Sequence, residues 1–176
     1  MEPANRSAFR VLFLCTGNSA RSQMAEAILN RKGRGRFVAE SAGSQPASCV
    51  NPYAIKVLRE GGIEWEGREP RGVAGLEGGW DFVITVCDRA REACPVFPGE
   101  PILSHWGMPD PAAVVGDDDV KFAAFYDTLN LISRRIDLLL SLPVAKLERL
   151  VLETQMQAIG EYGLALGRGA VDECAS

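Results

Sequence analysis

Histidine is nearly absent from this sequence, with His105 the single one among 176 residues. A serine or cysteine nucleophile that depends on a histidine base needs that histidine beside it. The sequence therefore argues against a Ser–His or Cys–His site, and we expect His105 to be a hydrogen-bonded structural residue. Long apolar runs are also missing, so no segment is predicted to span a bilayer. Because the N-terminus shows no signal peptide, we expect a cytoplasmic chain without membrane contact.

Charge of one sign is not in large excess either. The formal net charge is -4, which gives no reason to expect binding to nucleic acid or to a membrane surface. The five cysteines are an odd number and do not suggest a disulfide framework. Reduced, reactive thiols in the cytoplasm fit this count better. Cys49 and Cys174 fall in a predicted loop and a polar tail, and we assign them no role.

Apolar runs alternate with segments of helical spacing along the chain. Strands are predicted at residues 9–14, 37–42, 80–86 and 101–104. Helices are predicted from the first loop to about residue 31 and at 51–60, 88–93, 117–142 and 144–166, whereas residues 64–79 are predicted to form a loop with a short helix. This alternation predicts an α/β fold, in which a four-stranded, mostly parallel sheet is flanked by helices.

The chain is long enough for one domain with a sizeable core. We expect residues 1–8 to be a disordered lead-in and residues 9–142 to form the single domain. Residues 143–176 are expected to be a C-terminal helical extension and a polar tail. A helix that covers the sheet is favoured for this extension over a surface for a partner.

The stretch after the first predicted strand carries the chemistry of the chain, and it reads Cys15-Thr16-Gly17-Asn18-Ser19-Ala20-Arg21-Ser22. Five residues separate Cys15 from Arg21. A loop of this length can curl so that successive backbone N–H groups form an anion-binding nest, and the following helix N-terminus adds further donors. Gly17 is expected to adopt a backbone angle that a side chain would forbid. The Asn18 side chain is expected to pin the loop from inside.

Arg21 and Ser22 complete this pattern. The planar guanidinium of Arg21 suits two oxygens of a tetrahedral oxyanion. The same positive field stabilises a thiolate, so the pKa of Cys15 is expected to be low, roughly 3.5–7.5. Ser22 is placed to donate a hydroxyl hydrogen bond to this thiolate. A buried structural cysteine with an exposed arginine is the alternative, and the complete C-x5-R-S pattern favours the functional interpretation.

Residues 11–27, VLFLCTGNSARSQMAEA, resemble the phosphate loop of the low-molecular-weight protein tyrosine phosphatases and of the arsenate reductases that share their fold. A second stretch separates the two groups. Residues 84–99, ITVCDRAREACPVFPG, and residues 105–112, HWGMPDPA, resemble thioredoxin-coupled arsenate reductases. The resemblance implies that Cys15 is the nucleophile, Cys87 the first resolving thiol and Cys94 the last. Without this resemblance, the interpretation of Cys87 and Cys94 as small buried hydrophobic residues would be favoured.

The resemblance extends to the segment Asp110-Pro111, which matches the acid loop of the family. A carboxyl group there is placed to protonate a departing oxygen. Two departures argue against an aromatic ester substrate. Ala112-Ala113 follow where the phosphatases usually have an aromatic residue, and Gln23 stands where they often have proline.

Some relatives bind a monovalent cation beside the loop. Asn18, Glu26 and Ser41 match that site, but residues 69–71 offer no matching aspartate. We therefore expect neither a metal nor a cofactor.

The sequence as a whole predicts a cytoplasmic arsenate reductase with weak phosphatase activity and a thioredoxin-like reductant as its partner. Phosphate and sulfate are expected to compete with arsenate. Two alternatives stay open: a low-molecular-weight tyrosine phosphatase, and a non-enzymatic thiol redox sensor or soft-metal-binding protein. The oxyanion is expected to be held by Thr16, Gly17, Asn18, Ser19, Ala20, Arg21 and Ser22.

Overall fold

The computed structural model describes residues 8–66 and 68–164 of the chain. Nearly all of the expected lead-in and most of the polar tail, including Cys174, lie outside this part. Four strands form one sheet in the order β2-β1-β3-β4, and every neighbouring pair is parallel. This confirms the predicted four-stranded sheet. The strands are β1 (Phe9–Cys15), β2 (Phe37–Gly43), β3 (Phe82–Thr85) and β4 (Ile102–His105).

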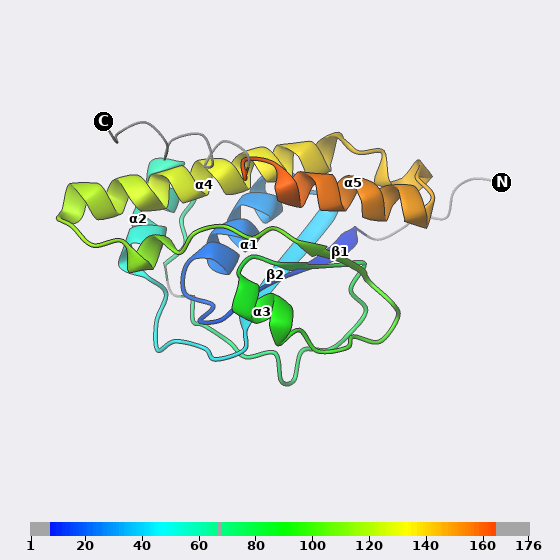
Figure 1. The fold of residues 1–176 in the computed structure, drawn as a ribbon, viewed down its shortest axis with the longest axis horizontal. Helices are drawn as coiled ribbons and strands as arrows, with labels where there is room; N and C mark the ends of the chain where they lie inside the picture. Colours follow the sequence, from blue (N-terminus) through cyan, green and yellow to red (C-terminus); the bar gives the residue numbers. More distant parts are fainter. Residues whose placement is uncertain (1–7, 67, 165–176) are drawn as a thin grey trace, which may run out of the picture.

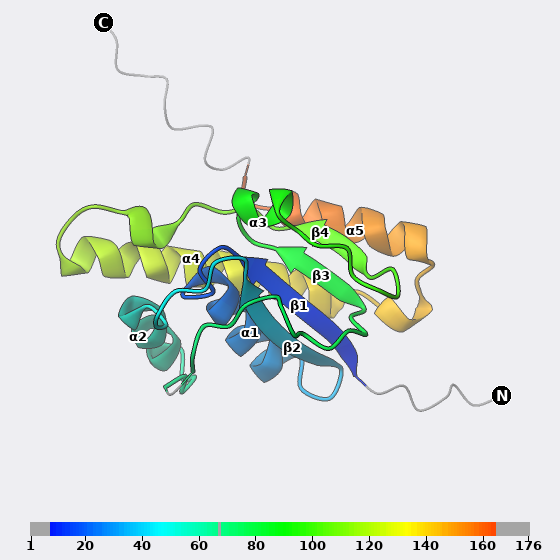
Figure 2. The ribbon, with the colours of Figure 1, turned by 90° about the horizontal axis from the view of Figure 1, so that it is seen from below.

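Helices join and cover these strands. Helix α1 packs on β1 and β2 and against α4, whereas α5 packs along the edge strand β4 and against α4 (Figures 1 and 2). None of the helices in the described part is long and apolar enough to cross a membrane. The helices are α1 (Arg21–Lys32), α2 (Pro52–Glu60), α3 (Asp88–Glu92), α4 (Asp118–Ser141) and α5 (Arg149–Glu161), with 3-10 turns η1 (Pro111–Ala113) and η2 (Val144–Lys146).

The local signals in the sequence place most of these boundaries. Asn51 caps α2 by accepting a hydrogen bond from the backbone N–H of Tyr53, as expected for an N-cap residue. Asp117 caps α4 in the same way through Val120. β1 is buried on both faces because it lies inside a parallel sheet with helices over it, which explains its continuous apolar run.

Two local predictions are wrong and one element was missed. The helix predicted at residues 144–166 does not start at Val144, because a 3-10 turn, Val144–Lys146, precedes α5, which begins at Arg149. The short helix expected within residues 64–79 is wrong, because the described residues of this stretch are irregular. Glycines at 72, 75, 78 and 79 disfavour a helix there, and side-chain contacts to distant elements hold the segment instead. The 3-10 turn at Pro111–Ala113 was not predicted; Asp110 caps it by accepting from the backbone N–H of Ala112.

Helix α5 packs along the edge strand β4 and so covers this edge of the sheet. Its apolar side chains Leu152, Met156 and Ile159 join the core. The fully buried Arg135 of α4 fastens its end by donating hydrogen bonds to the carbonyl groups of Gly160 and Tyr162. The same guanidinium also donates to the carbonyl groups of Trp106 and Gly107, after β4. Burial lowers the pKa of Arg135 to about 10, which leaves it charged near neutral pH.

Candidate active site

The predicted anion loop lies between the end of β1 and the start of α1, at the carboxyl edge of the sheet. Ligands of open α/β sheets bind at this edge. The neighbouring strand β2 ends at Gly43, which pairs with Cys15. A Cβ atom at Gly43 would collide with the carbonyl oxygen of Thr16, so a side chain there would push the loop away. Gly43 therefore permits the close approach of the two strand ends.

The loop curls around the sulfur of Cys15. The side chain is buried, with its Sγ atom 2.9 Å from the hydroxyl of Ser22 and 3.0 Å from the backbone nitrogen of Asn18. Burial raises the pKa of Cys15, and the hydrogen bonds from Ser22 and Asn18 oppose this rise. The expectation of a lowered pKa is wrong for this structure, because removal of the thiolate from water outweighs its hydrogen-bond donors.

Replacement Ser22→Ala removes the largest contribution that lowers the pKa of Cys15. We expect the pKa of Cys15 to rise further, so that less thiolate is present at neutral pH. The rate of alkylation of Cys15 by iodoacetamide, followed on its peptide by mass spectrometry, should reach its midpoint at a higher pH than in the wild type. The exposed Ser44 provides the control Ser44→Ala, whose profile should not move. A superimposable profile for Ser22→Ala would contradict the assignment.

Asn18 pins the loop from inside, as expected. Its side chain is fully buried, and its Nδ2 atom donates to the hydroxyl groups of Ser22 and Ser41, both at 2.9 Å. The expectation for Gly17 is wrong, since Asn18 is the residue that adopts the left-handed conformation, with φ of 49°. Asparagine tolerates this region better than most residues.

Two residues that sequence reasoning missed support the loop from the irregular segment before β3. The backbone N–H of Arg71 donates to Oδ1 of Asn18 at 2.9 Å, and its Nε atom donates to the carbonyl group of Ser41 at 2.8 Å. Trp65 donates to Oε1 of Gln23 at 2.8 Å. No sequence pattern marks these contacts, because they join residues 30 to 53 positions apart. Among the described residues, no three acidic, histidine or cysteine side chains gather to hold a metal ion.

Arg21 and Asp110 face each other across the loop. The Nη2 atom of Arg21 lies 3.4 Å from a carboxylate oxygen of Asp110, and its Nη1 atom donates to the carbonyl group of Met108 at 3.0 Å. The Asp110 side chain is about half exposed, which lets it exchange protons with solvent. Both residues line a cavity of about 510 Å³, and Ala112 leaves its wall without an aromatic ring.

The structure brings two of the three predicted relay thiols together. Cys15 and the buried Cys87 line the same cavity, where Sγ of Cys87 lies 3.4 Å from the hydroxyl of Thr16. Cys94 lies apart and is partly exposed, and burial raises the pKa of its thiol. Of the predicted oxyanion-binding residues, Asn18 and Ser22 do not line the cavity. Those that line it are Thr16, Gly17, Ser19, Ala20 and Arg21.

His105 has the structural role expected for it. Its Nδ1 atom lies 2.8 Å from the hydroxyl of Thr85, and its Nε2 atom lies 3.0 Å from a carboxylate oxygen of Asp88. These contacts tie the first residue of α3 to the end of β4. They hold the helix that stands between Cys87 and Cys94 in place.

The chain is similar in sequence and in fold to known proteins, and the match to their family includes the anion loop. Residues 10–151 match the family model of the low molecular weight phosphotyrosine protein phosphatases. The chain is 38% identical over 127 residues to an arsenate reductase from Halalkalibacterium halodurans, a match covering 72% of this chain and 91% of that protein.

Two solved structures have the same fold. An arsenate reductase in its phosphate-binding state matches with a TM-score of 0.60 at 27% identity, covering 76% of this chain and 97% of that one. A thioredoxin-dependent arsenate reductase from Corynebacterium glutamicum matches with a TM-score of 0.58 at 28% identity, covering 78% and 62%. The sequence, the fold and the loop around Cys15 agree: the chain belongs to the low-molecular-weight phosphotyrosine protein phosphatase family and, within it, to the arsenate reductases.

Proposed function

We propose that this protein reduces arsenate to arsenite through a relay of three thiols, Cys15, Cys87 and Cys94. The observation that carries the proposal is the cavity shared by Cys15 and Cys87. A phosphatase needs one thiol at its anion loop, whereas a reductase needs a second thiol within reach of the first. The arsenate reductases among its relatives, one of them named thioredoxin-dependent, support the choice of substrate and of reductant.

In the first stage, Cys15 forms a covalent bond with the arsenate oxyanion. The Cys15 thiolate attacks arsenic and forms a sulfur–arsenic bond, while one oxygen departs with a proton supplied by Asp110. Arg21 and the loop amides hold the remaining oxygens through charge-assisted hydrogen bonds. The 3.4 Å contact between Arg21 and Asp110 supports these roles, because it places the acid beside the cation that binds the oxyanion.

The second stage moves two electrons. The Cys87 thiolate attacks Sγ of Cys15, the electron pair of the sulfur–arsenic bond stays with arsenic, and arsenite leaves. Cys94 then attacks Cys87, which frees Cys15 and leaves a Cys87–Cys94 disulfide. A thioredoxin-like dithiol reduces this disulfide, and each step after arsenite release is a thiol–disulfide exchange.

The last exchange requires α3 to open. Seven residues at about 1.5 Å each separate the Cα atoms of Cys87 and Cys94 by roughly 10 Å if the segment is helical, whereas a disulfide bridges up to about 7 Å. Opening of α3 also breaks the contact between Asp88 and His105. A helix of five residues has little stability of its own, so this opening costs little.

We therefore expect amide exchange in residues 88–93 to accelerate when the Cys87–Cys94 disulfide forms. The reduced protein is compared with the Cys15→Ala variant trapped in the disulfide form, with the bond verified by mass. β3 should stay equally protected in both forms and serves as the internal control. Equal protection of residues 88–93 in both forms would refute the opening of α3.

The direct test of the proposal is arsenate-dependent consumption of NADPH with thioredoxin and thioredoxin reductase, run against glutaredoxin with glutathione. Sustained turnover with thioredoxin is expected. Binding or oxidation that stops after one equivalent would favour a redox sensor or a soft-metal-binding protein. Hydrolysis of an aryl phosphate does not distinguish a phosphatase from a reductase. An anion loop and an acid such as Asp110 would catalyse this hydrolysis in either enzyme.

A further inference from the structure

We infer that the protein dithiol that reduces the relay docks in the groove between the segment around Cys94 and helix α5, and that α5 is the wall that selects this partner. The inference rests on the proposed function, since it concerns the last step of the relay. It assigns a role to a helix whose larger part lies beyond the residues that match the family model.

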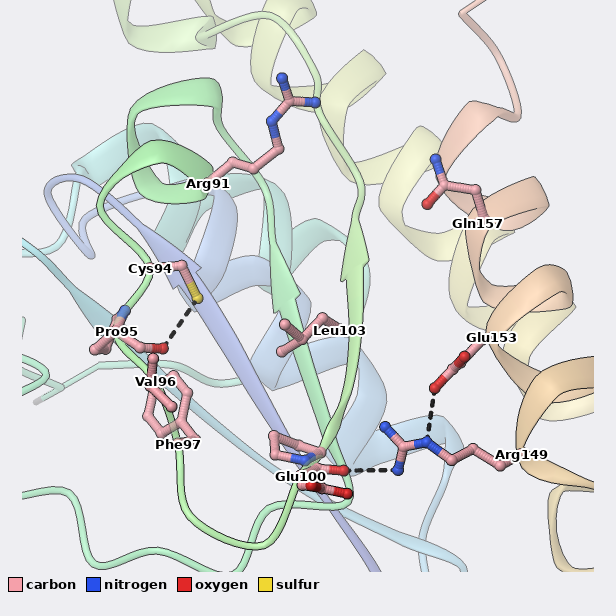
Figure 3. Close-up of a pocket in the computed structure, with 11 residues that line it drawn as sticks. Arg91, Cys94, Pro95, Val96, Phe97, Glu100, Leu103, Arg149, Glu153 and Gln157 are labelled. Atoms are coloured by element: carbon pink, nitrogen blue, oxygen red, sulfur yellow. Dashed lines mark hydrogen bonds and ion pairs between the residues drawn. The ribbon is translucent and has the colours of Figure 1, made fainter.

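The groove has a volume of about 700 Å³ and is distinct from the cavity of Cys15. In Figure 3, Cys94 lies on one side, Leu103 of β4 lies on the floor, and α5 forms the opposite side. Its apolar side chains are open to solvent: Val96 is 99% exposed and Leu103 is 61% exposed. Exposed apolar side chains rimmed by polar ones are typical of surfaces that bind another protein.

One stripe of α5 faces the groove. Arg149, Glu153 and Gln157 follow one another at intervals of four residues and all line it (Figure 3). Nε of Arg149 pairs with Glu153 at 2.7 Å, and its Nη1 atom donates to the carbonyl group of Glu100 at 2.7 Å. Arg149 and Glu153 of this wall are therefore already engaged with the protein.

A second stripe holds α5 in place. Its buried residues are Leu152, Met156 and Ile159, and Ser104 of β4 donates to the carbonyl group of Met156 at 2.9 Å. The α5 wall and β4 are thus fixed parts of the groove. The segment that carries Cys94 must move when α3 opens, whereas α5 and β4 need not move. The α5 wall therefore presents the same surface in the reduced and the oxidised protein.

The chemistry of the groove favours a protein over a small thiol. Two cations, Arg91 and Arg149, and two carboxylates, Glu100 and Glu153, line it, so their charges cancel. Glutathione, a small charged thiol, carries two carboxylates, whereas Arg91 is the one cation of the groove without an ion pair among the described residues. A protein that carries its two cysteines in an apolar surface is complementary to Val96, Phe97 and Leu103.

Docking there brings the partner to the sulfur that is accessible. In the reduced protein Cys94 lines the groove and is partly exposed, whereas Cys87 is buried, and opening of α3 moves the segment that carries Cys94 while the α5 wall stays in place. The partner's thiolate attacks Sγ of Cys94, Cys87 leaves as a thiolate, and a mixed disulfide forms. The second thiol of the partner then attacks its own bonded cysteine and releases Cys94, so that two electrons have passed from the partner to this protein.

The test is the variant Gln157→Trp, which adds bulk to the wall without touching the core, since Gln157 is exposed. We expect the KM for thioredoxin, measured with saturating arsenate, to rise at least tenfold. Turnover driven by dithiothreitol and hydrolysis of an aryl phosphate should both stay within twofold of the wild type. The control is Gln155→Trp, an exposed residue of α5 that does not line the groove, and it should behave as the wild type.

A second variant, Leu103→Asp, places a charge on the floor and should raise the same KM while sparing the dithiothreitol reaction. An unchanged KM for thioredoxin in both variants overturns the inference, as does an equal loss with thioredoxin and with dithiothreitol. Wild-type turnover with glutathione but not with thioredoxin also overturns it. Failure of the wild type to reduce arsenate with any of these reductants refutes the proposed function instead.

Discussion

Replacement Cys15→Ser is expected to abolish arsenate reduction and aryl phosphate hydrolysis together, each by on the order of 10³-fold or more. In the proposed mechanism both reactions begin with attack by the sulfur at the centre of the anion loop. A serine hydroxyl at this position has no histidine base beside it, because the single histidine is engaged with Thr85 and Asp88. The hydroxyl would therefore stay protonated and unreactive.

The same variant should keep its affinity for oxyanions. In the proposed mechanism Arg21 and the loop amides bind the oxygens independently of the sulfur, so phosphate should still protect the variant against thermal unfolding, as a bound ligand does. The control is Cys49→Ser, which removes an exposed cysteine that does not line the cavity of Cys15 and should leave both activities intact. Retention of either activity in Cys15→Ser would show that another residue is the nucleophile.

The sheet and its helices could be predicted because local signals dominate there. The apolar run of β1, the caps Asn51 and Asp117 and the alternation of strands with helices each act within a few residues. The position of the site follows from the same facts, since a parallel sheet brings the ends of β1 and β3 to one edge. Cys15 and Cys87 could thus be placed near each other from the sequence.

What the sequence could not supply depends on distant contacts. Arg71 and Trp65 support the loop from an irregular stretch whose composition predicts no contact at all. The pKa of Cys15 depends on a balance between burial and hydrogen bonds, and the depth of burial is set by everything packed around the loop. The motif alone identifies the hydrogen-bond donors that lower the pKa of Cys15. It does not show how deeply the thiol is buried, and burial raises this pKa.

Replacements Cys87→Ser and Cys94→Ser are expected to separate the two chemistries. Hydrolysis of an aryl phosphate ends when water attacks phosphorus and breaks the sulfur–phosphorus bond at Cys15. This step needs neither of the other thiols. Both variants should therefore hydrolyse an aryl phosphate at close to the wild-type rate. Multiple-turnover reduction of arsenate with thioredoxin should be lost in both, because the relay stops before arsenite release in Cys87→Ser and after it in Cys94→Ser.

The amount of arsenite formed distinguishes the two positions. Cys87→Ser should release no arsenite, because this variant has no second thiol in the cavity to break the sulfur–arsenic bond at Cys15. Cys94→Ser should release about one equivalent and then stop as a Cys15–Cys87 disulfide, since Cys87 can attack but its own disulfide has no resolving thiol. The equivalents of arsenite are quantified in a single-turnover experiment, and the trapped disulfide is mapped by mass spectrometry. If both variants turn over arsenate at the wild-type rate with thioredoxin, the relay is wrong and the second and third thiols have no part in the reaction.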